Sequence, residues 1–451
     1  MLQSLNPYTN QIIAEYEYDS AAIIDEKINL LSQGSANWAK QEMFLRLEGI
    51  KLLKTSLERK INVLSDSVTA ETGKPISQSR LEIEKCIQLC NYYNEVANNL
   101  FEPEFQIYND SKAIIIRQPL GIILGIMPWN FPIWQTLRFA IPTIIAGNSV
   151  AIKPAPNTVQ SSKLLESLFH EIGHESIFQL FLADHDQIAE LIADSKIKGV
   201  SFTGSSSAGA KIGGMASSSL KPSVLELGGS DPMIVTEDFP LDEAIDIVIK
   251  SRFNNNGQSC IAAKRLFVPK KQIDLYNEKL IFEITKLIKG DPQIEETFIS
   301  CLARPDLAEN LQKQYDSLTK QNAKVHLEGG RSNELNSIFD PVLIELNPSL
   351  SNLWKEECFG PLLCITPYDT IQQAVELANS TPYGLGATIC SNDNDLCNYL
   401  SLTVKAGYVS VNSLLRSDPR FPFGGLELSG YGKELGREGA FSFTNQKTIV
   451  T

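Results

Sequence analysis

Residues 199–209 read GVSFTGSSSAG, a short apolar run that passes through a glycine loop into small residues. The run at 199–202 is typical of a buried strand, and residues 207–215 are predicted to form the helix that follows it. An earlier segment has the same pattern, with a strand at 149–153 and a helix at 161–169. Two successive units of this kind predict a Rossmann-like arrangement around a parallel sheet.

The rest of the chain extends this pattern. Residues 83–100 have the spacing of an amphipathic helix, while 112–117 and 122–126 are apolar runs expected to be strands. Helical and strand-like segments then alternate, and a second strand-helix series begins after Gly229. We find no repeat, low-complexity tract or obvious linker. The chain of 451 residues is therefore expected to be an α/β protein of two large domains or about three smaller ones.

Composition narrows the functional class. The formal net charge of -13 argues against binding to nucleic acid or to an anionic membrane. The N-terminus lacks a signal-peptide pattern, and no apolar run approaches the roughly 20 residues of a membrane span. Eight cysteines without close even spacing suit free thiols in a reducing compartment, so we expect a cytoplasmic protein. An anionic substrate would have to be bound by a few local cations.

A candidate nucleophile and a candidate base lie 34 residues apart. Cys260 occurs in NGQSCIAAKR (256–265), where the small residues are interpreted as the start of a helix whose N-terminus stabilises a thiolate. Glu226 occurs in VLELGG (224–229) and is interpreted as a partly buried general base at a strand end. A lone cysteine fits a small buried apolar residue equally well. Together the two residues indicate covalent catalysis followed by hydrolysis.

Further polar residues also follow short apolar runs, as ligand loops at strand ends do. In GIMPWNFP (125–132), the prolines hold Asn130 on a stiff turn, from which its amide can donate to a developing oxyanion. An asparagine between prolines is also a common turn former. The segments AIKPAP (151–156) and EECFGP (356–361) are two more candidate ligand loops.

With these motifs in this order, the sequence resembles the NAD(P)-dependent aldehyde dehydrogenases over essentially its whole length. The similarity runs from NPYTN (6–10) to FPFGGLELSGYG (421–432). Within the superfamily, ELGGSDP (226–232) and GYGKELG (430–436) most resemble the shorter bacterial succinate-semialdehyde dehydrogenases.

The resemblance implies the aldehyde dehydrogenase fold. It assigns a Rossmann-like NAD(P)-binding domain to 1–100 and 120–228, and an α/β catalytic domain to 229–428. It also implies a small β oligomerisation element at 101–119 and 429–451, and hence a homodimer or homotetramer.

The resemblance also implies a two-stage oxidation. The Cys260 thiolate attacks the aldehyde, and the Asn130 amide and the Cys260 N–H hold the oxyanion. Hydride then passes to the nicotinamide, and water activated by Glu226 hydrolyses the remaining thioester.

The cofactor site is likewise implied by the resemblance. Lys153 matches the adenosine-ribose contact and Glu357 the nicotinamide-ribose contact, although the strict G-x-G-x-x-G fingerprint is missing. Relatives that prefer NAD often have Glu where this chain has Pro156, which neither bonds a hydroxyl nor repels a 2′-phosphate. NAD with some tolerance of NADP is therefore expected. The expected cofactor residues are Ile126, Pro128, Trp129, Lys153, Gly204, Ser205, Gly209, Leu227, Glu357 and Phe359.

The substrate is expected to be succinate semialdehyde or another short ω-carboxyaldehyde. Arg138, eight residues beyond Asn130, matches an arginine that binds the distal carboxylate in succinate-semialdehyde dehydrogenases. A second family arginine is replaced by Asn254, which weakens this interpretation and leaves uncharged aliphatic aldehydes as the alternative. The missing charge could come from the loop that contains Arg416, Ser417 and Arg420.

Three other functions have sequence features against them. Coenzyme-A-acylating relatives lack the base that Glu226 would provide, and a catalytically silent protein would have lost Cys260, Asn130 or Glu226. The segment HEIGH (170–174) matches the H-E-x-x-H zinc pattern, but Gly173 is predicted to end that helix and no third ligand follows. We therefore expect no metal.

Overall fold

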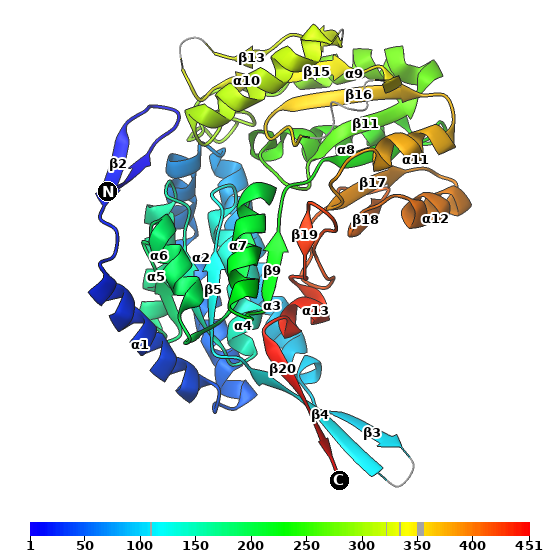
Figure 1. Ribbon diagram of the computed structural model, residues 1–451. Helices are drawn as coiled ribbons and strands as arrows, with labels where there is room; N and C mark the ends of the chain where they lie inside the picture. The colour runs from blue at the N-terminus through cyan, green and yellow to red at the C-terminus, as the bar shows by residue number, and fades with distance from the viewer. Residues whose placement is uncertain (109–110, 322, 333–334, 350–355) are drawn as a thin grey trace.

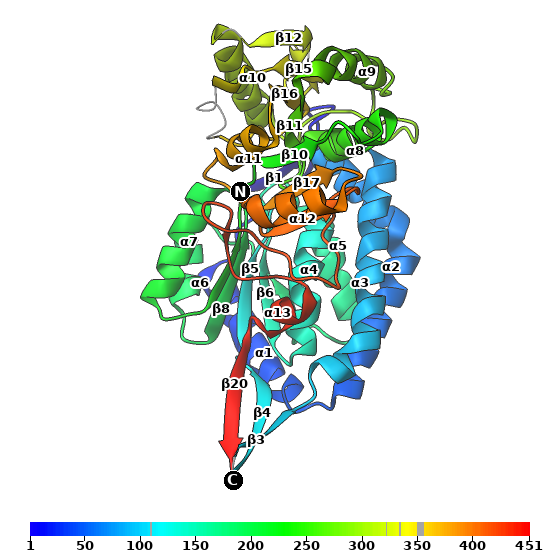
Figure 2. The same ribbon diagram turned by 90° about the vertical axis from the view of Figure 1, so that its right-hand side faces the viewer.

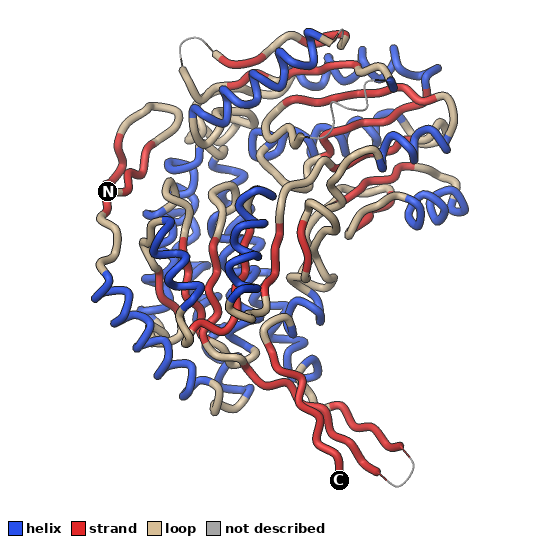
Figure 3. Tube along the Cα trace, in the orientation of Figure 1, coloured by secondary structure: helices blue, strands red, loops and turns tan. Residues whose placement is uncertain are grey.

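The computed structural model describes residues 1–108, 111–321, 323–332, 335–349 and 356–451. Figure 1 shows two parts, each built of a sheet and its helices, whose sheets differ in orientation. A narrow β ribbon extends from the lower part. The tube view in Figure 3 shows strands flanked by helices in both parts, which confirms the predicted α/β class.

The lower part contains a sheet that has six strands among the described residues, in the order β19-β9-β8-β5-β6-β7. The neighbouring pairs are parallel except for β19 with β9. Every residue of β5 is buried, as expected for a strand covered by helices on both faces. The strands are β5 (Ile122–Ile126), β6 (Ser149–Lys153), β7 (Phe178–Leu180), β8 (Ile197–Thr203), β9 (Ser223–Glu226) and β19 (Gly430–Tyr431).

Helices pack on both sides of this sheet, and the predicted helices within 83–100, 161–169 and 207–215 all form. In Figure 2, the long α2 and α3 run along one side of the molecule and α6 and α7 along the other. The helices are α1 (Ala21–Trp38), α2 (Met43–Thr72), α3 (Ile76–Leu100), α4 (Pro132–Ile145), α5 (Val159–Glu171), α6 (His185–Ala193) and α7 (Ser206–Ser218).

The upper part is a second sheet that has seven strands among the described residues, in the order β12-β15-β16-β11-β10-β17-β18. Only β12 runs antiparallel to its neighbour there. Its strands are β10 (Asp231–Val235), β11 (Ala263–Pro269), β12 (Lys324–Leu327), β15 (Val342–Glu345), β16 (Leu362–Tyr368), β17 (Gly386–Cys390) and β18 (Tyr408–Val411). The helices are α8 (Leu241–Phe253), α9 (Ile273–Thr285), α10 (Pro305–Lys320), α11 (Ile371–Asn379) and α12 (Asn394–Thr403), and α13 (Gly436–Phe441) lies near the C-terminus.

The ribbon joins segments that are far apart in the sequence. The strands β3 (Glu104–Tyr108), β4 (Ser111–Pro119) and β20 (Thr444–Val450) form an antiparallel sheet with β4 in the middle. Residues 109 and 110 of the predicted element at 101–119 lie outside the described residues. Residues 322, 333–334 and 350–355 of the predicted catalytic domain are likewise outside the described residues. The domain boundaries and the oligomerisation role stay predictions.

Short elements complete the structure. The hairpin of β1 (Leu2–Leu5) and β2 (Ile12–Tyr16) opens the chain, and β13 (Gly330–Arg331) pairs with β14 (Phe339–Asp340). Two 3₁₀ turns, η1 (Asn254–Gly257) and η2 (Lys270–Gln272), flank β11. Among the helices that the structure describes, none is both long and apolar enough to cross a membrane.

Candidate active site

The segments that contain Asn130 and Cys260 meet between the two sheets. Asn130 follows β5 and precedes α4, on the turn predicted from its flanking prolines, and its side chain is buried. Its Nδ2 donates to the carbonyl oxygen of Gln258 at 3.0 Å, and Nδ2 of Asn255 donates to the carbonyl oxygen of Asn130 at 2.8 Å. These bonds hold the amide next to the cysteine loop, where an oxyanion donor would have to lie.

The cysteine loop has an unusual backbone. Asn255, Asn256 and Gly257 have φ angles of 53°, 54° and 74°, so three successive residues are left-handed. Asparagine tolerates this conformation better than most residues do. The Asn256 side chain also holds the turn, because its Nδ2 donates to the carbonyl oxygens of Gly73 (3.1 Å) and Cys301 (2.8 Å).

The predicted helix after Cys260 is wrong. Cys260 lies in a turn, and from Ala263 the chain continues as strand β11, in which every residue is buried. The strand is parallel to both β10 and β16, and this pairing with distant segments overrides the local preference of the small residues. Cys260 consequently has no helix N-terminus to stabilise its thiolate.

Removal from water favours the thiol form of Cys260. The residue is only partly exposed, and burial raises its pKa to about 12, against the smaller lowering effects of Lys264 and Arg138. The buried Nζ of Lys264 donates to the carbonyl oxygens of Ser259 (2.9 Å) and Cys260 (2.6 Å). Lys264 is not among the site residues predicted from the sequence. Its position inside an apolar strand is unusual for a lysine and could have indicated a functional role.

Glu226 is the last residue of β9, as predicted, and its side chain is only 2% exposed. Neither carboxyl oxygen has a hydrogen-bond partner among the described residues. Burial raises the pKa of Glu226 well above its ordinary value. Arg138 and Lys433 oppose this rise, and Glu434 adds to it. Burial therefore favours the protonated carboxyl, which must lose its proton before it acts as a base.

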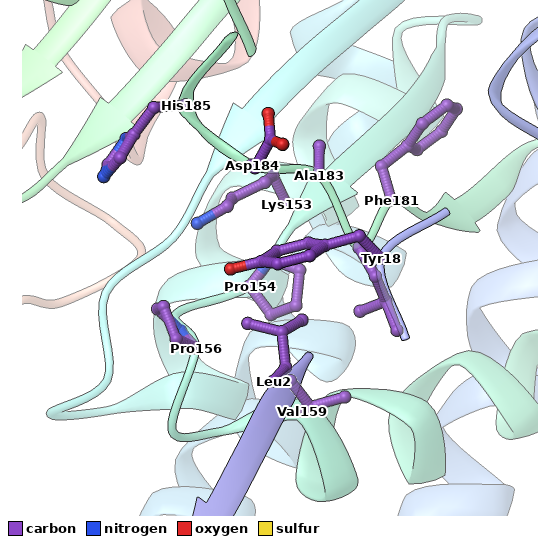
Figure 4. A pocket seen from close by; sticks show the side chains of 11 residues that line it. Leu2, Tyr18, Lys153, Pro154, Pro156, Val159, Phe181, Ala183, Asp184 and His185 are labelled. Carbon is purple, nitrogen blue, oxygen red and sulfur yellow. The ribbon is translucent and has the colours of Figure 1, made fainter. Parts of the chain in front are cut away.

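Lys153, at the end of β6, lines a pocket at the same sheet edge. Figure 4 shows it among Tyr18, Pro156 and His185. No carboxylate lies within ion-pair distance of Lys153 in the described part of the chain, and burial lowers its pKa. An unpaired, partly buried cation fits the phosphate and ribose groups of a dinucleotide.

The predicted pyrophosphate loop leads directly into α7. Ser205 is the N-cap of α7, and its side chain accepts a hydrogen bond from the N–H of Ala208 at 3.4 Å. A Cβ at Gly209 would lie 2.3 Å from Cδ2 of Leu227, so glycine is needed there for α7 to pack against the end of β9. The free N–H groups of the first turn are suited to a phosphate.

Glu357 and Phe359 lie beside the segments that follow β9 and β5. Glu357 accepts a hydrogen bond from the N–H of Gly229 at 3.1 Å and pairs with Lys264 at 3.0 Å. The ring of Phe359 packs edge-on against Trp129, with centroids 5.7 Å apart. The predicted residues Ile126 and Pro128 lie at the end of β5 and just after it. The structure thus gathers the predicted cofactor residues around the ends of β5, β6, β8 and β9.

The four predicted substrate residues have different surroundings. Arg138 is buried on α4, forms an ion pair with Glu434 and has its Cζ 4.8 Å from the centre of the Phe423 ring. Ser417 is buried, whereas Arg416 is exposed. Arg420 is exposed and pairs with Asp418 at 2.6 Å, so it is a weak candidate for a substrate contact.

The H-E-x-x-H pattern lies at a helix end, as predicted. Helix α5 ends at Glu171, and Gly173 has a φ of 73°. The ring of His174 packs edge-on against Trp38 with centroids 5.1 Å apart. Within the described residues, no three His, Cys, Asp or Glu side chains gather in a way that could hold a metal ion.

The two parallel-sheet α/β domains, with a cysteine turn and a glycine loop at the facing strand ends, are the architecture of the NAD(P)-dependent aldehyde dehydrogenases. The aldehyde dehydrogenase family profile matches residues 1–449, and the chain belongs to that family. The NAD(P)+-dependent succinate semialdehyde dehydrogenase of Escherichia coli (strain K12) is 35% identical over 448 residues, which cover 99% of this chain and 97% of that protein. A probable NADP+-dependent succinate-semialdehyde dehydrogenase of Synechocystis sp. (strain PCC 6803) is 34% identical over 449 residues, with 99% of each chain covered.

A solved structure agrees with these sequence matches. The crystal structure of succinic semialdehyde dehydrogenase from Streptococcus pyogenes, in complex with NADP+, superposes with a TM-score of 0.96 at 28% identity. The match covers 100% of this chain and 99% of that one. The prediction of an NAD(P)-dependent aldehyde dehydrogenase is confirmed at this level.

Proposed function

We propose that this enzyme oxidises succinate semialdehyde, or a similarly short ω-carboxyaldehyde, to the corresponding acid. The observation that carries the proposal is the environment of Arg138. Its guanidinium is buried, acts electrostatically on both Cys260 and Glu226, and has an Nη2 without a hydrogen-bond partner among the described residues. A buried unsatisfied donor on a cation suits a carboxylate ligand.

The chain's own residues account for both stages of the reaction. Cys260 loses its proton and its sulfur bonds to the aldehyde carbon, while the Asn130 amide and the Cys260 N–H stabilise the oxyanion. The nicotinamide, when bound, accepts the hydride. Glu226, once deprotonated, takes a proton from the water that attacks the thioester, and the acid and the free thiol are released.

Oxidation of uncharged aldehydes is a second candidate function, because Glu434 already neutralises much of the Arg138 charge. The two candidates are distinguished by kcat/KM for succinate semialdehyde and for butyraldehyde. Arg138→Ala is expected to lower the value for succinate semialdehyde by roughly 30- to 1,000-fold more than the value for butyraldehyde, because only the former loses a carboxylate contact. Arg420→Ala, which removes an exposed arginine, is the matched control. A wild type that prefers butyraldehyde, or an Arg138→Ala variant that slows both substrates equally, would contradict the carboxylate assignment.

We further propose that the cofactor site takes both NADP+ and NAD+. The pocket around Lys153 presents a cation and the neutral Pro156, and the nearby Asp184 is engaged as the N-cap of α6. The Synechocystis relative is an NADP+-dependent enzyme by name and the Streptococcus pyogenes structure contains NADP+, which favours NADP+ over the expected preference for NAD. Pro156→Glu is expected to reduce kcat/KM for NADP+ by about 10- to 100-fold through charge repulsion, with little effect on NAD+. Equal losses with both cofactors would show that the residue does not face the 2′ position.

A further inference from the structure

Lys85, on α3, lies beside the predicted substrate residues although the sequence analysis did not select it. Its Nζ donates to Oγ of the buried Ser417 at 2.7 Å and lies 4.0 Å from the centre of the Trp134 ring. Trp134 and Arg138 are four residues apart on α4 and therefore share a face of that helix. Lys85 and Arg138 thus line the same region from different helices.

The charge of Lys85 is not balanced by protein carboxylates. In the described part of the chain, no Asp or Glu oxygen lies within 4.0 Å of its Nζ. Burial, followed by repulsion from Arg138 and Arg416, lowers its pKa to about 7, with Cys86 and Glu82 acting in the opposite direction.

The nearest acidic groups are already engaged. Glu82 forms a buried ion pair with Lys74 and accepts backbone hydrogen bonds from α4. Asp418 pairs with Arg420. Among the described residues, Lys85 and the buried Arg138 have one carboxylate between them, Glu434, which pairs with Arg138. The remaining positive charge is one that an anionic ligand would balance.

We propose that Lys85 is a second cationic contact for the distal carboxylate of the substrate, oriented by its hydrogen bond to Ser417. The inference rests on the proposed ω-carboxyaldehyde substrate. Arg138 acts on the Cys260 thiol and Lys85 does not, so Arg138 is taken as the contact nearer the reacting carbon and Lys85 as the more distant one. Lys85 would supply, from α3, the charge that is lost where Asn254 replaces an arginine.

The test compares Lys85→Met with wild type on succinate semialdehyde and on butyraldehyde. The variant is expected to lose about 10- to 100-fold in kcat/KM for succinate semialdehyde, chiefly through KM, and to stay within about 3-fold for butyraldehyde. Inhibition by succinate should weaken to a similar degree. Lys85→Arg should retain most of the preference, because it keeps the charge. Arg80→Met removes a cation from the exposed side of the same helix and should alter neither substrate.

The possible outcomes separate this inference from the proposed function. Wild type without a preference for succinate semialdehyde would refute the carboxyaldehyde substrate, and the role of Lys85 with it. If wild type has the preference and Arg138→Ala removes it, but Lys85→Met slows both aldehydes equally or neither, Lys85 is not a substrate contact. Should Lys85→Met fail to fold, Lys85→Gln removes the charge but retains a neutral donor directed towards Ser417. That variant must show the same selective loss.

Discussion

Burial favours the protonated forms of both the Cys260 thiol and the Glu226 carboxyl. Burial raises the pKa of each group, although Arg138 opposes the rise in both cases. In its neutral form, neither group leaves an uncompensated buried charge. Each group must lose its proton before it can act as nucleophile or base.

Cys260→Ala is expected to lose more than about 10³-fold in kcat, because it removes the nucleophile. Initial rates of NAD(P)H formation measure this loss. The control is Cys358→Ala, because Cys358 is also a free and partly exposed thiol. Activity that persists in Cys260→Ala would refute the covalent mechanism.

Glu226→Gln is expected to give a burst of NAD(P)H close to one per active site and then to turn over slowly, because hydride transfer precedes the water step. Stopped-flow absorbance measures both phases. In wild type, the slow step should accelerate as pH rises, because the raised pKa of Glu226 keeps it protonated at lower pH. This pH dependence should be lost in the variant. Loss of the burst itself would place Glu226 in an earlier step.

The preference for the carboxyaldehyde is expected to depend on pH through Lys85. Its pKa of about 7 means that the free enzyme loses this charge as pH rises through that value. The ratio of kcat/KM for succinate semialdehyde to that for butyraldehyde should fall over the same range, since the ratio cancels ionisations common to both substrates. Lys85→Arg should make the ratio flat, and an unchanged slope in that variant would assign the titration to another group. The ionisable or charged groups around Lys85 are Glu82 and Cys86 on α3, Arg138 on α4, and Arg416 and Asp418 in the loop.

At the scale of elements, the start of α4 is held by a buried carboxylate from α3. Oε1 of Glu82 accepts hydrogen bonds from the N–H groups of Ile133 (2.9 Å) and Trp134 (3.0 Å), and the other oxygen pairs with Lys74. A carboxylate at a helix N-terminus satisfies free donors and complements the helix dipole. Because Asn130 lies two residues before this helix, the contact also helps to hold the proposed oxyanion donor in place.

Glu82→Gln is expected to destabilise the protein by about 3–5 kcal/mol, because it leaves Lys74 buried without a counter-charge. Denaturant unfolding and the thermal midpoint measure the effect. Glu84→Gln, two residues along the same helix, is the control, and combining Glu82→Gln with Lys74→Met should recover part of the loss. A stability equal to wild type would show that the pair contributes nothing.

At the scale of the whole molecule, the β ribbon exposes apolar side chains far from the active site. Phe105 and Ile107 on β3 are 73% and 78% exposed, and Val450 on β20 is 64% exposed. Phe105 and Ile107 are two residues apart and so lie on one face of the strand. Such a face on a protruding sheet suits association with another subunit.

The double change Phe105→Asp and Ile107→Asp is therefore expected to reduce the molecular mass in solution from that of an oligomer to that of a smaller species. Light scattering coupled to size exclusion measures the mass. Leu402→Asp replaces an 89% exposed leucine at the end of α12 and should leave the mass unchanged. An unchanged mass in the double variant would exclude this face of the ribbon from the subunit contact.

Local patterns in the sequence determined the α/β class, the strand-helix units around 149–218 and the loops with Asn130, Glu226 and Gly204. Apolar periodicity and turn residues act between near neighbours, and so they are visible in one sequence. Tertiary structure alone decided that Cys260 precedes a strand, that Glu434 pairs with Arg138, that Lys85 donates to Ser417 and that Lys264 pairs with Glu357. These features depend on contacts between segments separated by tens to hundreds of residues, and on burial that changes the charge state of a group. A single sequence encodes such contacts without any local period or turn that would reveal them.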